Sequence, residues 1–222
     1  LAQPSMLIDI GRITDLSYVK DAGDHIAIGA LTRHMDVEKS DIVKQHVPLL
    51  AHAAGYVGDA QVRHRGTIGG SLANNDPAAD YPAAALALNA RIHTTSREIA
   101  ADDFFQGMFT TALDEDEIIT AVSFTAPAKG GYGKFPNPAS RYAMAGVFVA
   151  KLADGSVRVA VTGASEDGVH RHDGLEAALS ADWSASAVDG VAISSDGLLS
   201  DIHGNAEYRA NLIKVMAKRA LA

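Results

Sequence analysis

The feature that most restricts the fold is a pair of apolar, β-rich segments separated by a short polar turn. The stretch RYAMAGVFVAKLADGSVRVAVTGA, residues 141–164, places Asp154-Gly155 between these segments. Aspartate and glycine both tolerate the positive φ angles that tight hairpin turns require, so the stretch predicts an antiparallel β-hairpin. We therefore expect a small antiparallel sheet in this part of the chain, packed on helices.

Short strands and helices are expected around this hairpin. The last segment, NAEYRANLIKVMAKRALA, predicts an amphipathic helix with Tyr208, Leu212, Val215 and Met216 on its apolar face. The segment DYPAAALALNA predicts a helix with Asp80 as its N-cap. Period-two alternation and flanking turn residues predict strands over residues 25–32, 90–100 and 117–127, and helices over residues 48–58 and 174–181.

A cluster of glycine and proline suggests where the chain divides. Gly130, Gly131 and Gly133 are followed closely by Pro136 and Pro138. Such residues interrupt regular structure, so we place a domain boundary near residue 127. The expected organisation is a first domain over residues 1–127 and a second, α+β domain over residues 128–222.

Composition excludes several classes of function. The 222 residues carry a net charge of −8, which disfavours general nucleic-acid binding. The chain contains no cysteine, so it cannot supply thiolate ligands to an iron–sulfur cluster or a thiol nucleophile. No apolar run is long enough to suggest a membrane span, and we expect a cytoplasmic protein. Metal-ligand spacing and acid–base motifs are also not evident, so we expect no metal site and no catalytic side chain.

One glycine pair remains as a candidate ligand site. The segment RGTIGGSLANNDPAADYP, residues 65–82, contains neither a P-loop nor a dinucleotide-binding glycine motif. Gly69 and Gly70 could let the backbone approach a ligand in a left-handed anion nest, with the hydroxyls of Thr67 and Ser71 beside it. Asp80 could then accept from a sugar hydroxyl. An ordinary turn followed by a helix cap explains the same residues about equally well.

The longer stretch around this pair resembles a known family. DAQVRHRGTIGGSLANNDPAADYPAAALAL is similar to the middle segment of the FAD-binding medium subunits of molybdenum hydroxylases, the carbon monoxide dehydrogenase and xanthine dehydrogenase type. Further similar stretches occur in the family's order: IGALTRHMDVEKS, FFQGMFTTALDEDEIITAV, GYGKFPNPASRYAMAGVFVAKL and SDIHGNAEYRANLIKVMAKRAL. The resemblance covers almost the whole chain and implies two domains of the FAD-binding PCMH-type fold, a mixed α/β subdomain followed by an α+β domain.

The resemblance also implies cofactor-binding positions. The family's glycine loop binds the FAD diphosphate and adjoining groups, and it matches Thr67, Ile68, Gly69, Gly70 and Ser71. Further FAD contacts are implied at Asp80, Ile119, Tyr132, Lys134 and Val57. Ile119 and Val57 could equally be core residues, and Lys134 could be a surface charge.

The family divides its chemistry among subunits. A large partner subunit holds the molybdenum cofactor and a small one carries [2Fe–2S] clusters, in what we expect is a dimer of heterotrimers. This chain would take electrons onto FAD and pass them to an external acceptor. The family's first glycine-rich FAD loop lies upstream of the sequence given, so we expect an N-terminally truncated chain that retains FAD weakly or not at all. A docking domain without flavin and a stand-alone FAD oxidase remain as alternatives.

Overall fold

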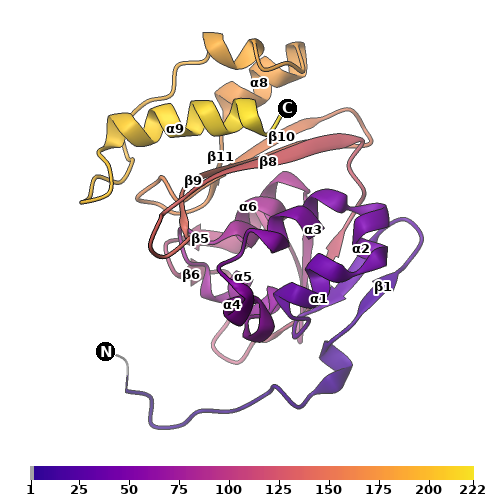
Figure 1. The fold of residues 1–222 in the computed structure, drawn as a ribbon. Coiled ribbons are helices and arrows are strands. Elements are labelled where there is room, and N and C mark those ends of the chain that lie inside the picture. The colour runs from indigo at the N-terminus through magenta and orange to yellow at the C-terminus, as the bar shows by residue number, and fades with distance from the viewer. Residues whose placement is uncertain (1–2) are drawn as a thin grey trace.

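Two antiparallel sheets organise the chain in the computed structural model, which describes residues 3–222 (Figure 1). The first sheet has five strands, in the order β1 (Val19–Asp21), β2 (Ile26–Gly29), β7 (Ile119–Phe124), β3 (Arg91–Thr94) and β4 (Glu98–Ala100). The second has four, in the order β11 (His170–Arg171), β10 (Val157–Thr162), β9 (Ala143–Lys151) and β8 (Lys129–Pro136). A small ribbon pairs β5 (Phe105–Gly107) with β6 (Thr110–Thr111). The expected α+β class is confirmed.

The antiparallel hairpin predicted around Asp154-Gly155 is confirmed and consists of β9 and β10. Lys151 pairs with Val157, and the register continues without a break to Gly146 and Thr162. Gly155 has a φ of +88°, which a residue with a side chain rarely adopts. The alternating apolar residues of the two strands face two different layers, so both faces of this sheet are covered.

Helices surround the sheets. They are α1 (His34–Lys39), α2 (Asp41–His46), α3 (Pro48–Gly55), α4 (Ala60–Arg65), α5 (Ile68–Asn74), α6 (Asp80–Ala87), α7 (Ala101–Phe104), α8 (Asp173–Ala181) and α9 (Ala206–Arg219), with short 3₁₀ turns at Thr14–Leu16 and Ala187–Gly190. Two of them begin with residues typical of helix starts. The Ser40 hydroxyl accepts from the Val43 N–H at the start of α2, and Pro48 occupies the first turn of α3.

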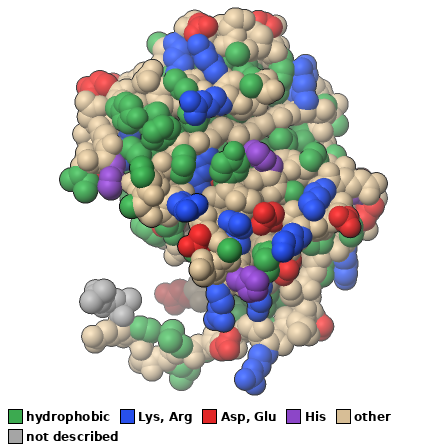
Figure 2. All heavy atoms as spheres, in the orientation of Figure 1, with side chains coloured by type: hydrophobic (Ala, Val, Ile, Leu, Met, Phe, Trp, Pro, Cys, Tyr) green, Lys and Arg blue, Asp and Glu red, His purple; other side chains and the backbone are tan. Residues whose placement is uncertain are grey.

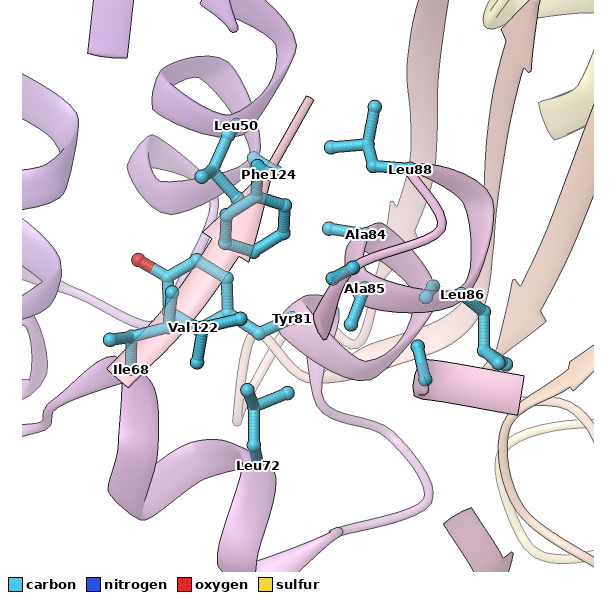
Figure 3. Close-up of a cluster of buried hydrophobic side chains, with 14 of the residues drawn as sticks. Leu50, Ile68, Leu72, Tyr81, Ala84, Ala85, Leu86, Leu88, Val122 and Phe124 are labelled. Atoms are coloured by element: carbon cyan, nitrogen blue, oxygen red, sulfur yellow. The ribbon is translucent and has the colours of Figure 1, made fainter. Parts of the chain in front are cut away.

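Helix α6 lies between the two halves of the chain. All eight of its residues are buried, and it packs on β9 and β10 on one side and on α3 and α5 on the other. Figure 3 shows its side chains meeting those of α3, α5 and β7 in one apolar core. Phe148 and Ala160, from the second sheet, belong to the same core. The two expected domains thus share a core, and the division at residue 127 stays a prediction.

The glycine cluster before residue 137 forms a strand rather than a boundary loop. A Cβ atom on Gly131 would lie 1.9 Å from the Ala220 carbonyl oxygen, and one on Gly133 would lie 2.3 Å from that of Met216. The glycines are therefore needed because the backbone of α9 crosses directly over β8. The prediction that this glycine cluster interrupts regular structure is therefore wrong.

The second core lies between the other face of the four-stranded sheet and helices α8 and α9. In Figure 1 these two helices lie over that face, on the side opposite α6. The buried face of α9 carries Leu212 and Met216, as expected, but Tyr208 is 41% exposed and Val215 is only partly buried. Arg209 takes the buried position, donating to the carbonyl oxygens of Met144 and Gly163 at 2.7 and 3.0 Å.

The first residues that the structure describes lie apart from this body. Residues 3–13 contain no helix or strand, and Met6, Leu7 and Ile8 are each more than 70% exposed. Figure 2 shows this segment extending away with hydrophobic side chains along it. Over residues 3–222, no helix has both the length and the apolar character needed to cross a membrane.

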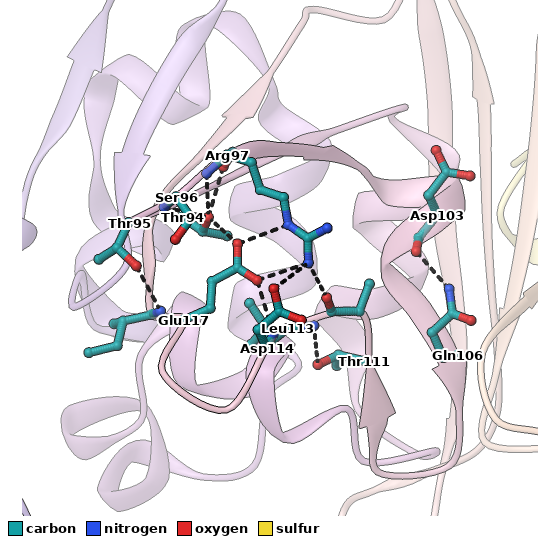
Figure 4. A network of polar contacts seen from close by, with 12 residues as sticks. Thr94, Thr95, Ser96, Arg97, Asp103, Gln106, Thr111, Leu113, Asp114 and Glu117 are labelled. Atoms are coloured by element: carbon teal, nitrogen blue, oxygen red, sulfur yellow. Dashed lines mark hydrogen bonds and ion pairs between the residues drawn. The ribbon is translucent and has the colours of Figure 1, made fainter.

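A polar network fastens the β3–β4 hairpin to the loop before β7 (Figure 4). The Glu117 carboxylate accepts from the Thr94 hydroxyl at 2.5 Å, from Arg97 at 3.0 and 3.1 Å, and from the Asp114 N–H at 3.0 Å. These donors, Arg97 first, lower the pKa of Glu117 from 4.5 to about 2.

This network predicts a defined acid sensitivity. Because the pKa of Glu117 is lowered in the folded chain, its stabilisation is complete above pH 4.5 and is lost as the pH falls toward 2. We expect Glu117→Gln to be less stable than the parent at pH 7, with the difference shrinking through this window. Urea unfolding at several pH values measures it. Glu115→Gln, at an exposed position of the same loop, serves as the control, and a pH-independent difference for Glu117→Gln would contradict the assignment.

Candidate functional site

A cavity of about 370 Å³ lies where α4, α5 and the start of α6 meet β8 and the loop after it. This volume falls in the usual range of small-molecule sites. Its wall is formed by His34, Val57, Gly58, Val62, Arg65, Gly66, Thr67, Gly70, Ser71, Asn74, Asp76, Ala79, Asp80, Lys134, Ser140, Arg141 and Tyr142. The wall therefore combines cations, hydroxyls, apolar groups and an aromatic ring.

A buried ion pair forms one side of this cavity. Lys134 Nζ lies 2.9 Å from Asp80 Oδ2 and donates to the Tyr56 carbonyl oxygen, also at 2.9 Å. The Tyr132 hydroxyl donates to the other carboxylate oxygen, Oδ1. Lys134 and Asp80 side chains are 1% and 5% exposed. Burial raises the pKa of Asp80, while the Lys134 ammonium and the Tyr132 hydroxyl oppose that rise.

Asp80 has a different role from the helix cap expected from the sequence. Ala79 occupies the N-cap position of α6, and no side chain caps this helix. Asp80 instead stands in the first turn, where a negative carboxylate is favoured by the helix dipole, and its side chain turns toward β8. The expected cap is therefore wrong because Lys134 and Tyr132, far along the chain, offer the carboxylate stronger partners.

The glycine pair also differs from expectation. Gly69 and Gly70 lie in the first turn of α5, not in a left-handed nest, so the nest is wrong. Their N–H groups already donate, Gly69 to the Ala30 carbonyl oxygen at 2.9 Å and Gly70 to the Thr67 hydroxyl oxygen at 3.2 Å. The N–H groups of Ile68 and Ser71 donate to backbone carbonyls as well. A ligand here would therefore meet side-chain donors rather than this backbone.

The glycine at position 69 is explained by packing. A Cβ atom there would lie 2.5 Å from the Ala30 Cβ and 2.8 Å from the Ala30 carbonyl oxygen. The absent side chain lets α5 lie directly against the chain that follows β2. A Cβ atom on Gly70 would meet only the Thr67 hydroxyl oxygen, at 2.9 Å, so this position is open toward the cavity.

His34 was not singled out from the sequence, although it forms part of the cavity wall. It is 4% exposed, and burial, followed by the charge of Arg63, lowers its pKa to about 4. Its Nδ1 atom has no hydrogen-bond partner among the described residues. The imidazole is therefore neutral at pH 7 and is held between the Tyr81 ring, at a centroid distance of 5.2 Å, and Gly66. Arg65, Arg141 and Tyr142 also line the cavity. The one sequence signal that could have identified them is that they lie close in the chain to the glycine loop or to Lys134.

The residues proposed from the resemblance fall into two groups. Six line the cavity together: Val57, Thr67, Gly70, Ser71, Asp80 and Lys134. Four do not line it: Ile68 and Ile119 are core residues, Gly69 packs on Ala30, and Tyr132 acts through Asp80. The structure thus gathers positions separated by up to 77 residues along the chain around one cavity.

Comparison with known proteins identifies the family. Residues 1–127 match the FAD binding domain in molybdopterin dehydrogenase. The chain belongs to this family. It is 36% identical to the nicotine 6-hydroxylase medium subunit of Paenarthrobacter nicotinovorans, over 100% of this chain and 82% of that protein. It is 34% identical to the carbon monoxide dehydrogenase medium chain of Hydrogenophaga pseudoflava, over 99% and 82% of the two chains.

Solved structures agree with this assignment. Carbon monoxide dehydrogenase from Hydrogenophaga pseudoflava matches with a TM-score of 0.89 and 36% identity, covering 99% of this chain and 82% of that chain. Quinoline 2-oxidoreductase from Pseudomonas putida 86 matches with a TM-score of 0.85 and 26% identity, covering 99% and 81%. The expected PCMH-type fold and family are confirmed. FAD is the cofactor that the description of this family names.

The cavity in this family member suits such a cofactor chemically. FAD combines a doubly charged diphosphate, sugar-like hydroxyls and flat aromatic rings. Arg65 and Arg141 supply positive charge, Thr67 and Ser71 supply hydroxyls, and Tyr142, half-exposed, supplies a ring. Within residues 3–222 the ion-paired arginines are others, so the charges of Arg65 and Arg141 are open to an anionic group.

Proposed function

We propose that this chain is the flavoprotein subunit of a molybdenum-containing hydroxylase or dehydrogenase. In this proposal, electrons reach FAD from the [2Fe–2S] clusters of a small partner subunit and leave to an external acceptor. A large molybdopterin-binding subunit oxidises the substrate, the assembly is a dimer of heterotrimers, and it works in the cytoplasm. FAD supplies the redox chemistry. The protein supplies binding, orientation and local charge.

The observation that carries the proposal is the arrangement around Asp80. A buried ammonium–carboxylate pair is energetically demanding and is retained where geometry holds it tightly. Here Lys134, Tyr132 and the start of α6 fix the Asp80 carboxylate at the cavity wall. Two of the carboxylate's four acceptor positions remain, which leaves capacity for a cofactor hydroxyl. The hydroxyls of Thr67 and Ser71 and the two open arginines border the same cavity.

The roles of individual residues follow from this arrangement. We assign Thr67, Gly70 and Ser71, with Arg65 and Arg141, to the diphosphate and adjoining groups. Asp80 and Lys134 hold a polar part of the cofactor, and Val57 offers an apolar contact. Ile68, Gly69, Ile119 and Tyr132 support the wall from behind.

Co-production with both partner subunits tests the function. We expect a complex that contains FAD and whose flavin absorbance bleaches when the molybdenum subunit oxidises its substrate. Carbon monoxide, aldehydes, purines and N-heterocycles are the substrates to supply. A complex that forms with reducible iron–sulfur clusters but without flavin would instead support the docking-domain alternative. A flavin-loaded chain that oxidises a substrate alone would support the stand-alone oxidase.

A single hydroxyl tests the assigned cavity. We expect Ser71→Ala to weaken FAD binding by roughly tenfold or more, because a hydrogen bond to a charged group contributes about 1.5–3 kcal/mol. Flavin fluorescence titration measures the ratio of dissociation constants, even where binding is weak. Ser96→Ala, at an exposed turn outside the cavity, is the matched control. Equal affinity of the two variants would place the cofactor elsewhere.

A further inference from the structure

The donors available for an anion in this cavity are fewer than the glycine loop suggests. The N–H groups of residues 68–71 all donate within the protein. The side-chain donors on the cavity wall are the hydroxyls of Thr67, Ser71, Ser140 and Tyr142, the amide of Asn74, the ammonium of Lys134, the guanidinium groups of Arg65 and Arg141, and the imidazole of His34. Of these, Lys134 and His34 are more than nine-tenths buried, and Lys134 already donates to Asp80 and to the Tyr56 carbonyl oxygen. His34 is thus a buried polar side chain at the cavity wall whose ring makes no hydrogen bond within residues 3–222, and such a group requires a physical explanation.

The position of the imidazole is tightly fixed. The backbone N–H of His34 donates to the Gly66 carbonyl oxygen at 3.0 Å, and a Cβ atom on Gly66 would lie 2.4 Å from His34 Nε2. Gly66 therefore has no side chain where the ring needs room. Nε2 lies beside Gly66, which itself lines the cavity, whereas Nδ1 is buried away from solvent. The ring thus presents one nitrogen to the cavity and keeps the other in the protein.

The neutral ring has a preferred tautomer in this setting. With the proton on Nε2, the buried Nδ1 is only an unfilled acceptor; with the proton on Nδ1, an N–H donor would be buried without a partner. Unpaired buried donors are the rarer case in proteins. The tautomer protonated on Nε2 therefore directs an N–H group toward the cavity, at the part of the wall that Gly66 forms.

We propose that His34 is a binding residue that donates from Nε2 to a diphosphate oxygen of the cofactor. The inference rests on the flavoprotein role above and adds a residue to that site. A neutral donor complements Arg65 and Arg141, because it binds an oxygen without adding a further charge. The proposal commits His34 to the phosphate end of FAD rather than to the flavin ring.

Two amide variants separate the ring nitrogens. The amide nitrogen of glutamine reaches the position of Nε2, whereas that of asparagine reaches the position of Nδ1. We expect His34→Gln to keep FAD affinity within about threefold of the parent, and His34→Asn to lose roughly tenfold or more, as expected for a hydrogen bond to a charged group. ADP affinity should follow FAD affinity, and riboflavin affinity should not change. Equal losses for both amides, or a loss for riboflavin as large as that for ADP, would overturn the proposal.

A third variant distinguishes binding from structure. His34→Phe removes the buried unpartnered nitrogen, so the ligand-free protein should unfold at the same or a higher denaturant concentration while FAD and ADP affinity fall. Tyr81→Phe is the control, because the Tyr81 hydroxyl is also buried and unpartnered but does not line the cavity. It should leave both affinities unchanged.

Titration of ADP should also shift the Nε2 resonance of His34 in nitrogen-15 NMR spectra, and an unshifted resonance at saturation would contradict the contact. If the complex of the parent chain with both partner subunits binds neither FAD nor ADP, both this inference and the proposed function fail; if that complex binds both and the His34→Asn complex binds them equally well, only this inference fails.

Discussion

Asp80→Ala is expected to lower the free energy of unfolding by about 3–5 kcal/mol, because it leaves a buried charge without its partner. The Lys134 side chain is 1% exposed, and within residues 3–222 its ammonium has only Asp80 and the Tyr56 carbonyl oxygen as partners. The Tyr132 hydroxyl, also buried, loses its acceptor in the same variant. Equilibrium unfolding in guanidinium chloride measures the loss, and FAD affinity should fall with it.

A second substitution tests the cause of this loss. Asp80→Ala combined with Lys134→Met removes both charges, and we expect it to recover most of the stability while leaving FAD binding impaired. Recovery would show that the loss arises from the stranded ammonium rather than from the cavity made by the shorter side chain. If the double variant is less stable than Asp80→Ala by the full effect of Lys134→Met alone, the two residues act independently and the account of the pair is wrong.

Gly133→Ala is expected to destabilise the protein by about 3 kcal/mol, at the upper end of typical overpacking effects. The added Cβ atom would lie 2.3 Å from the Met216 carbonyl oxygen, in the last turn of α9, where the Met216 side chain is fully buried in the second core. The helix must then move off β8 and loosen the second core. Faster cleavage of α9 by a protease, together with equilibrium unfolding, checks the result.

A matched glycine provides the control for this variant. Gly190→Ala adds the same methyl group at a position with no atom within 4 Å and no positive φ. We expect it to change the free energy of unfolding by less than about 0.5 kcal/mol. Similar losses at the two positions would mean that the close crossing of α9 and β8 does not explain the glycines of this strand.

Local sequence patterns predicted the elements of the fold well. The Asp154-Gly155 turn, the alternating strands and the capped helices depend on interactions between residues close in the chain, so the sequence displays them directly. The glycines of β8 were read as a chain interruption instead. These glycines are needed because the backbone of α9, some 80 residues later in the chain, crosses close to β8, and no local sequence pattern shows that contact.

The candidate site was likewise predicted only in part from the sequence. The segment around Gly69 and Gly70 drew attention to the correct region, and the resemblance identified a family that the comparisons confirm. Neither showed that the backbone N–H groups of the glycine turn are already bonded, nor that His34 reaches the cavity. Both depend on how the segment between β2 and α1 pairs with the residues that begin α5.

The antiparallel hairpin, the helices and the family could be predicted because residue types at fixed short spacings encode them. Tertiary structure alone decided what the chemically important side chains do. Asp80 became the partner of Lys134, 54 residues away, instead of a helix cap. The physical reason is that burial removes water as a competing partner, so a carboxylate and an ammonium that the fold brings together bind each other whatever their separation along the chain.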